Sequence, residues 1–213
     1  MKKPPPIRPR AARSASADSD LARLRAAAAG CHDCDLWRHA TQVVFGEGSA
    51  RAQVVLIGEQ PGDAEDRSGR PFVGPAGRLL DRALVDAGID RAAVYLTNTV
   101  KHFKFTPRGK RRLHQRANAQ EQAACRQWLD AEIAQLRPRI VVCLGAMAAK
   151  AIFGTAFGLM KQRAQWIELG ADRVGIATVH PSYLLRVPDE ERESAYREFV
   201  ADLRKIRLRM DTL

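Results

Sequence analysis

Residues 52–63, AQVVLIGEQPGD, join a short apolar run to a loop that contains two glycines and two acids. An apolar run of this length that ends in glycine is typical of a strand buried on both faces of a parallel sheet. Comparable runs occupy residues 92–98, 139–145 and 171–179, and RAQWIEL (163–169) is a further strand candidate. Segments with helical spacing lie at 76–89, 117–136, 146–154 and 189–210. Strands that alternate with helices predict an α/β fold, a three-layer sandwich whose central, mainly parallel four-stranded sheet is flanked by helices.

The length and composition predict one domain. The chain has 213 residues, of which 46% are hydrophobic, enough to form a core. Residues 1–17 are rich in Pro, Arg and Ser and predict a disordered basic tail, and the domain is expected to span residues 18–213, beginning with a capped helix that ends at Gly30. No apolar run approaches the roughly 20 residues that a membrane helix needs, and the N-terminus lacks the apolar region of a signal peptide. We therefore expect a cytoplasmic protein without membrane contact.

Positive charge is concentrated in two segments. Residues 1–13 contain five Lys and Arg residues, residues 101–116 contain seven, and neither segment contains an acid. These twelve charges account for the formal net charge of +11, so the rest of the chain is close to neutral. A basic patch on a neutral body is typical of a surface that docks a polyanion, whereas a basic face that only maintains solubility is the alternative.

Polar side chains follow three of the predicted strands. Glu59 comes after the first strand, Asn98 ends the second, and His180 follows the last. Because open α/β sheets bind ligands at the carboxyl ends of their strands, we expect these residues to converge on one site. Taken alone, Glu59 is also compatible with an exposed loop acid, Asn98 with a turn cap, and His180 with a loop position before Pro181.

Glycines near this site indicate close approach to a ligand. Gly58 and Gly62 of GEQPGD leave the backbone accessible, but the loop matches neither the G-x-G-x-x-G fingerprint nor a P-loop, so a nucleotide cofactor is disfavoured. RPFVGPAGR (70–78) brings Phe72 in front of a helix, where its ring either stacks on a flat ligand or belongs to the core.

The four cysteines favour a metal site. Cys31 and Cys34 have the spacing of a ligand pair, and Cys125 and Cys143 complete a set of four. A cytosolic chain does not form structural disulfides, although thiols on a helix or a strand also serve as core filler. Zinc and a [4Fe–4S] cluster are both compatible with this spacing.

Two further loops are suited to nucleic acid. KHFKFTPRGKRRLHQR (101–116) interleaves aromatic residues with cations that can contact phosphates. Its His114 is expected to stay neutral and nucleophilic, because nearby cations lower the pKa of an imidazole. In HPSYLLR (180–186), Ser182 can bind a phosphate, Arg186 adds charge, and one of the two leucines can wedge into a base stack. The alternatives are a basic loop with an incidental histidine and an ordinary capped loop.

Together these motifs resemble the uracil-DNA glycosylase superfamily. The resemblance runs from about Cys31 to the C-terminal helix and leaves residues 1–17 outside. GEQPG, HPS and the four cysteines look like the iron–sulfur (family 4) glycosylases, and RPFVGPAGR and TNTVKHFKF add to the match. KRRLH (110–114) and the Gln60 of GEQPG are similar to the UdgX branch, whose members become covalently attached to uracil-containing DNA.

The resemblance implies a cofactor and a partner. A [4Fe–4S] cluster with a structural role would be held by Cys31, Cys34, Cys125 and Cys143. The partner would be uracil-containing DNA, with single strands favoured, and the protein would be a monomer. The side chains that would contact this DNA are Lys101, Lys110, Arg111, Arg112, Ser182 and Arg186.

The resemblance also implies roles at the reaction centre. The residues that would bind the base are Gly58, Gly62, Phe72 and Asn98. Phe72 would stack on uracil and Asn98 would read the pyrimidine edge. His180 would stabilise negative charge on the departing base, and His114 would be the nucleophile. The side chains that would support the reaction are Glu59, Gln60 and Asp63.

The chemistry explains why such groups are needed together. A base inside a duplex must be flipped out, and breaking its N-glycosidic bond leaves positive charge at C1′ of the sugar and negative charge on uracil. A neutral imidazole held beside C1′ can capture it before water does, and the resulting C–N bond has no easy second step. We therefore predict uracil excision in a single turnover, with His114 linked to the abasic site. Glu59 would either orient His114 or balance the developing charge.

Two other functions are compatible with the sequence. One is a conventional glycosylase of the same fold that turns over many times, which would release uracil in molar excess over enzyme. The other is a non-catalytic, metal-stabilised module that would bind nucleic acid regardless of uracil.

Overall fold

The computed structural model describes the backbone of residues 10–213 and the side chains of residues 17–213. Five strands form one sheet in the order β2-β1-β5-β7-β6. The parallel strands are β1 (Val54–Gly58), β2 (Val94–Asn98), β5 (Ile140–Leu144) and β7 (Val174–Thr178). The short edge strand β6 (Ile167–Glu168) pairs antiparallel with β7. The predicted mainly parallel α/β fold is confirmed, and the candidate strand at 163–169 adds a fifth strand to the four predicted.

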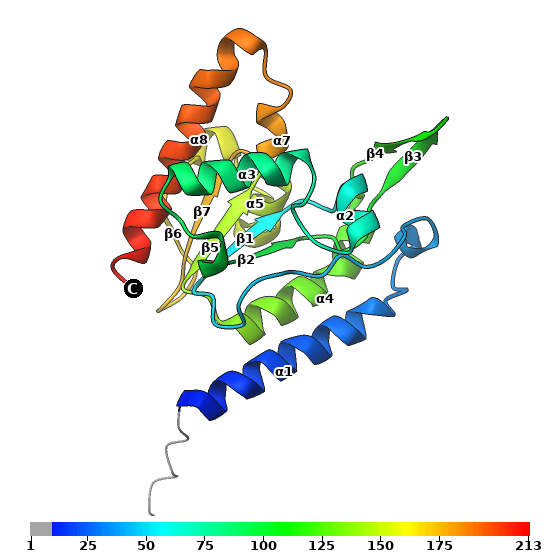
Figure 1. Cartoon of the computed structure of the whole chain (residues 1–213), viewed down its shortest axis with the longest axis horizontal. Coiled ribbons are helices and arrows are strands. Elements are labelled where there is room, and N and C mark those ends of the chain that lie inside the picture. The colour runs from blue at the N-terminus through cyan, green and yellow to red at the C-terminus, as the bar shows by residue number, and fades with distance from the viewer. Residues whose placement is uncertain (1–9) are drawn as a thin grey trace, which may run out of the picture.

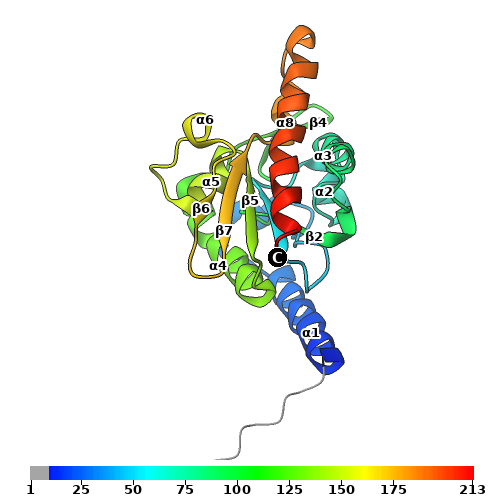
Figure 2. The same cartoon turned by 90° about the vertical axis from the view of Figure 1, so that its left-hand side faces the viewer.

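Helices cover both faces of this sheet (Figure 1). On one face pack α3 (Pro75–Asp86), α7 (Pro181–Leu184) and α8 (Asp189–Met210). On the other pack α1 (Arg10–Ala29), α4 (Ala119–Leu136) and α5 (Ala146–Phe153). The turned view in Figure 2 shows the strands between these two layers. The remaining short helices are α2 (Asp63–Ser68), α6 (Leu159–Gln162) and single turns at Asp35–Arg38 and Arg91–Ala93.

Successive side chains of each strand enter different cores. Val54 and Leu56 pack in the cluster beneath α3 and α8, whereas Val55 and Ile57 pack in the cluster beneath α4 and α5. This is the alternation expected of an extended chain. Because both faces are covered, all five residues of β1 are buried and the strand reads as a continuous apolar run.

Local signals fix the helix that follows the basic segment. The Asn118 side chain accepts a hydrogen bond from the Glu121 N–H at 2.9 Å, and the Glu121 carboxylate accepts one from the Asn118 N–H at 2.6 Å. This reciprocal capping box starts α4 at Ala119. The helix ends at Leu136, shortly before Pro138, which cannot continue it.

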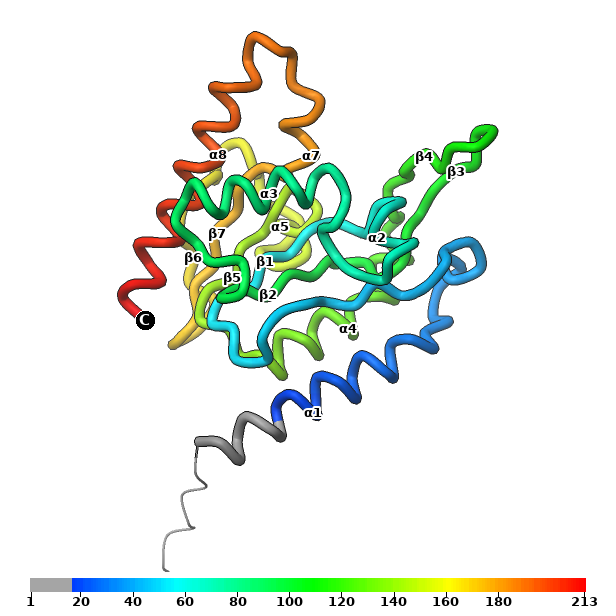
Figure 3. Tube along the Cα trace, in the orientation of Figure 1, coloured from blue at the N-terminus to red at the C-terminus, as the bar shows by residue number. Residues whose placement is uncertain are grey.

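The N-terminal helix is longer than expected. α1 begins at Arg10, so residues 10–17, predicted as part of a disordered tail, are helical. Residues 1–9 of that predicted tail lie outside the described residues. The trace in Figure 3 shows α1 running beside α4, and the two helices are in contact. None of the described helices is both long and apolar enough to cross a membrane.

The basic segment forms a hairpin rather than a loop. β3 (Phe105–Arg108) and β4 (Arg111–His114) pair antiparallel, and the hairpin projects from the body of the protein (Figure 1). Gly109 turns the chain at the tip with a φ of +57°, a left-handed conformation that glycine adopts without strain. His114 pairs with Phe105 at the opposite end, so the predicted nucleophile lies at the base of the hairpin.

Candidate active site

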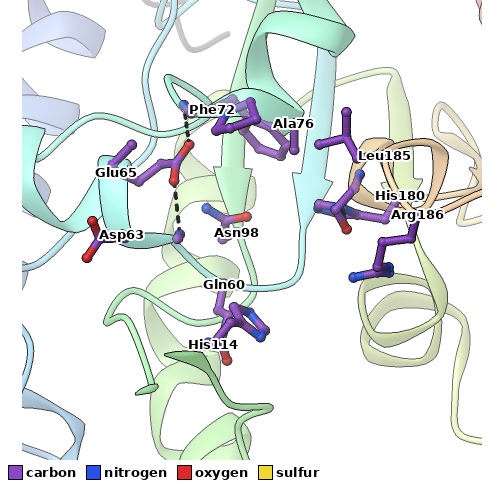
Figure 4. A pocket seen from close by; sticks show the side chains of 15 residues that line it. Gln60, Asp63, Glu65, Phe72, Ala76, Asn98, His114, His180, Leu185 and Arg186 are labelled. Carbon is purple, nitrogen blue, oxygen red and sulfur yellow. Dashed lines mark hydrogen bonds between the residues drawn. The ribbon is translucent and has the colours of Figure 1, made fainter. Parts of the chain in front are cut away.

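A pocket of about 570 Å³ opens at the carboxyl ends of β1, β2 and β7. Figure 4 shows the side chains that surround it. Of the residues predicted from the sequence, its wall contains Gln60, Gly62, Asp63, Phe72, Asn98, His114, His180, Ser182 and Arg186. Segments that are far apart in the sequence therefore meet at one cavity. Of the three polar residues expected to converge after the strands, Asn98 and His180 line it and Glu59 does not.

Gly58 allows the base-binding side chains to lie against the sheet. A Cβ atom at Gly58 would lie 2.4 Å from Oδ1 of Asn98 and 2.6 Å from Cζ of Phe72. Phe72 itself has a φ of +57°, which is uncommon for a bulky residue. Gly77 makes room for this turn, because a Cβ atom there would lie 1.8 Å from the Phe72 carbonyl oxygen. The glycines of GEQPGD and RPFVGPAGR thus shape the floor of the pocket.

His180 presents a neutral hydrogen-bond donor. Burial lowers its pKa to about 4, with smaller contributions from Arg186 and His114, so the imidazole is neutral at pH 7. Its Nδ1 accepts a hydrogen bond from the Ser182 N–H at 3.1 Å and lies 2.8 Å from Ser182 Oγ. The proton of the neutral ring is therefore on Nε2. Ser182 was predicted to bind a phosphate. In this structure it contacts His180 and determines which ring nitrogen carries the proton.

His114 reaches the pocket from the hairpin. Its pKa is lowered mainly by burial and also by the nearby charge of Arg186, while the carboxylate of Glu59 opposes the shift. The sequence predicted this direction but attributed it to neighbouring cations. Glu59 is half-buried and does not belong to the pocket wall, so its influence on His114 is electrostatic.

Gln60 holds the base of the hairpin in place. Its Nε2 donates a hydrogen bond to the carbonyl oxygen of Gln115 at 2.9 Å, and its Oε1 accepts one from the Ala117 N–H at 3.1 Å. Only 7% of Gln60 is exposed. The residue therefore connects the loop after β1 to the segment that follows His114.

Arg112 is anchored inside the protein, which corrects its prediction as a DNA contact. Its guanidinium donates to the buried Asp66 at 2.6 Å, pairs with Asp63, and lies 5.3 and 5.0 Å from the ring centroids of Phe103 and Phe105. Such contacts leave it little capacity to bind a phosphate. They attach the hairpin to α2.

Asp63 is engaged in the same anchoring. Hydrogen bonds from Arg67 and Arg112 lower the pKa of its carboxyl, so it is ionised and paired. Glu65, which the sequence analysis did not select, accepts from the N–H of Gly62 at 3.0 Å and of Gly74 at 2.7 Å, as the dashed lines in Figure 4 show. Glu65 stands three residues after Gly62, the residue that caps α2, and this spacing is the sequence signal that could have identified it.

The other predicted DNA contacts divide into two groups. Lys101 is only 1% exposed and pairs with Glu132, so its prediction as a DNA contact is wrong. Lys110 and Arg111 are exposed near the tip of the hairpin, and Arg186 is exposed at the pocket. These three remain free to meet a phosphate backbone.

Three of the four cysteines gather away from the pocket. Cys125 interacts electrostatically with Cys31 and Cys34, and the indole N–H of Trp128 donates to Cys31 Sγ at 3.1 Å. Cys143 is wrong as a fourth ligand, since it lies in β5, is fully buried, and packs in the core beneath α4 and α5. Within the described residues, no three His, Cys, Asp or Glu side chains converge tightly enough to hold a single metal ion.

His102 is a buried imidazole that directly follows a residue in contact with this cysteine group. It is 4% exposed and follows Lys101, whose backbone N–H donates to Cys125 Sγ at 3.1 Å. Burial lowers the pKa of His102, and the nearby imidazole of His32 lowers it further, while Asp66 opposes the shift. His32 lies between Cys31 and Cys34 in the sequence. His102 was not predicted as a ligand, because the sequence signal for a metal site came from the four cysteines alone.

Comparison with known proteins assigns the family. A family model of the uracil DNA glycosylase superfamily matches residues 45–204. The chain belongs to this superfamily. It is 42% identical over 158 residues to the type-4 uracil-DNA glycosylase of Thermotoga maritima, covering 73% of this chain and 78% of the relative. It is 35% identical over 177 residues to that of Archaeoglobus fulgidus, covering 79% and 85%.

Family membership confirms the resemblance to the uracil-DNA glycosylase superfamily found in the sequence. A type-5 uracil-DNA glycosylase of Pyrobaculum aerophilum is also similar, with 31% identity over 155 residues and 64% of each chain covered. The superfamily match contains the whole pocket and the hairpin. This superfamily member therefore has its candidate active site and His114 within one homologous domain.

Proposed function

We propose that this protein cleaves the N-glycosidic bond of deoxyuridine in DNA and that His114 then captures C1′ of the sugar. The observation that carries the proposal is the location of His114, which lines the same pocket as Asn98 and His180 although it comes from the hairpin. A hydrolytic enzyme needs only water at this place. A neutral imidazole in the wall supplies a nucleophile at high effective concentration.

Base recognition is assigned to the pocket floor. The Phe72 ring is suited to stack on the flat pyrimidine. The Asn98 carboxamide carries both a donor and an acceptor, which complement the O4 and N3–H of uracil. Because Asn98 is 3% exposed, water competes little for these groups.

Bond cleavage is assigned to two histidines. As the bond between C1′ and uracil N1 breaks, its electron pair moves onto the base, and the Nε2–H of His180 donates to the developing oxyanion. A ring nitrogen of neutral His114 gives its lone pair to C1′ and forms the new C–N bond. The resulting imidazolium then releases its remaining N–H proton to solvent. The negative charge of Glu59 stabilises the cationic sugar and the imidazolium that precede this loss.

A [4Fe–4S] cluster is proposed beside α4. Cys31, Cys34 and Cys125 fit as ligands, and we assign the fourth position to His102 in place of Cys143. The electrostatic contact of Cys125 with Cys31 and Cys34, and the hydrogen bond from the Lys101 N–H beside His102 to Cys125 Sγ, support this ligand set. When bound, it would supply a structural link between the segment that contains Cys31 and Cys34 and the start of the hairpin.

A denaturing gel tests the proposed function. The protein is mixed with a single-stranded oligonucleotide that contains one uracil, and an adduct that survives heat and detergent is expected. His114→Ala should form no adduct, and an oligonucleotide with thymine in place of uracil serves as the control. Absence of an adduct with the parent protein, or its persistence in His114→Ala, would contradict the role of His114.

The alternative is a glycosylase that turns over many times. The 42% identity to a type-4 enzyme favours it. Uracil release in molar excess over enzyme, without an adduct, would establish this alternative.

A further inference from the structure

A lysine and a glutamate form an ion pair in the core behind the pocket. Lys101 Nζ lies 2.5 Å from Oε2 of Glu132 in α4, and 1% and 0% of the two side chains are exposed. A buried ion pair is often no more stabilising than an apolar pair of similar volume, because both charges lose their hydration. Stability alone therefore does not explain it.

The Lys101 ammonium has three acceptors. Besides Glu132, it donates to Thr97 Oγ1 at 2.7 Å and to the backbone carbonyl oxygen of Asn98 at 2.8 Å. The other carboxylate oxygen of Glu132 accepts from the Tyr95 hydroxyl at 3.0 Å. Each ammonium proton thus has a partner, and the position of the ammonium is determined.

β2 is an edge strand of the sheet, so no further strand among the described residues offers the Asn98 carbonyl oxygen a hydrogen bond on that side. The Lys101 ammonium supplies it. The Thr99 N–H donates to the carbonyl oxygen of Gly58 at 3.0 Å, so the backbone groups of Thr99 face β1. Backbone groups alternate in direction along a strand, and those of Asn98 therefore face outward. Lys101 occupies the place that a further strand would take.

We propose that Lys101 is a positioning residue for base recognition. Its ammonium fixes the Asn98 carbonyl and so the direction in which the Asn98 carboxamide enters the pocket. Its backbone N–H donates to Cys125 Sγ at 3.1 Å, which attaches the same segment to α4. The inference rests on the proposed function, since it takes uracil as the base that Asn98 reads.

Three variants separate positioning from stability. Lys101→Met alone would leave Glu132 as an unpaired buried charge, so it is combined with Glu132→Gln, which removes both charges at nearly constant shape. Glu132→Gln alone leaves Lys101 without its counter-ion but keeps it as a hydrogen-bond donor to the Asn98 carbonyl oxygen, so it should lower stability while retaining recognition. Lys104→Met is the matched control, because it removes the lysine of a neighbouring pair with Glu121 (2.9 Å) that does not contact Asn98.

Binding to an uncleavable substrate is the measurement. The probes are single strands with 2′-fluorodeoxyuridine or the matching 2′-fluorothymidine, and the ratio of their Kd values is the uracil preference. Circular dichroism selects a temperature at which every variant is folded. The preference should fall about tenfold in Lys101→Met/Glu132→Gln, the size of one good hydrogen bond, and stay within about twofold in the other two variants.

A double-mutant cycle tests the route through Asn98. In an Asn98→Ala background, Lys101→Met/Glu132→Gln should cause no further loss of preference, because the residue that Lys101 positions is already gone. An undiminished preference in Lys101→Met/Glu132→Gln, or an equal loss in the Asn98→Ala background, would overturn the inference alone. A parent protein without uracil preference would overturn the proposed function and this inference together.

Discussion

The guanidinium of Arg112 donates a hydrogen bond to the buried carboxylate of Asp66 at 2.6 Å, and this contact joins β4 to α2. Asp66 also accepts from the backbone N–H and the hydroxyl of Thr41, at 2.9 and 2.6 Å, so its own position is held from a second segment. Arg112 and His114 are two residues apart on β4 and share one face of the strand. The anchor of Arg112 therefore sets the position of His114.

Replacing Arg112 with Met should slow adduct formation without weakening DNA binding. The hairpin would lose its attachment to α2, and a displacement of about 1 Å of a reacting group can cost on the order of a hundredfold in rate. We expect the single-turnover rate at saturating DNA to fall by about tenfold to hundredfold. Rapid-quench sampling on denaturing gels measures this rate.

Arg111→Met is the matched control. Arg111 is adjacent to Arg112 and exposed. Its loss should weaken DNA binding and reduce the slope of log affinity against log salt concentration by about one, the contribution of one phosphate contact. The rate at saturating DNA should stay unchanged. If both variants changed affinity and rate alike, the distinction between an internal anchor and a phosphate contact would be wrong.

Gly58→Ala should strongly reduce uracil excision while preserving the fold. The added methyl would lie 2.4 Å from Asn98 Oδ1 and 2.6 Å from the Phe72 ring, so both side chains must move out of place. We expect excision to fall by about a hundredfold or more, since positioning and recognition are lost together. Gly158→Ala, where no other atom lies within 4 Å of the added methyl, is the control. Parent-like excision by Gly58→Ala would show that the pocket floor tolerates displacement.

The fold was predictable because burial leaves a strong signal in the sequence. The apolar runs that became β1 and β5 are buried on both faces. Of the polar residues after the strands, Asn98 and His180 line one pocket as expected, whereas Glu59 lies outside its wall. The hairpin was not predicted, because β3 and β4 are mostly exposed and contain charged residues and Pro107 rather than an apolar pattern.

The side chains of the candidate site were harder to assign. Charge alone suggested that Lys101 and Arg112 contact DNA. Each is instead paired with an acid more than 30 residues away in the sequence, Lys101 with Glu132 and Arg112 with Asp66. Cys143 has the residue type of a ligand but the environment of a core residue. Only tertiary structure distinguishes a cation that is paired from one that is free.

His180 should make the stability of the protein depend on pH. Its pKa is about 4 in the folded protein and about 6.5 in the unfolded chain, so the unfolded chain binds more protons between these values. The free energy of unfolding contributed by His180 is therefore complete above about pH 6.5 and is lost as the pH falls towards 4. In His180→Asn, urea titrations should give a slope of this free energy against pH that is smaller by up to about one proton. Equal slopes in parent and variant would show that His180 is not buried in its neutral form.

Replacing single ligand candidates should separate the cluster site from the core. Cys143→Ala removes a sulfur that packs only in the core, so the iron content should stay at the parent level while the protein loses roughly 1 kcal/mol of stability to a small cavity. Cys125→Ala should lose iron and the brown absorption of the cluster. His102→Ala should also lower the iron content, whereas His102→Cys should restore it, because a thiolate can take the same ligand position. Colorimetric iron assays and visible spectra of the purified variants provide the measurement. Loss of iron in Cys143→Ala to the extent seen in Cys125→Ala would return Cys143 to the ligand set and exclude His102.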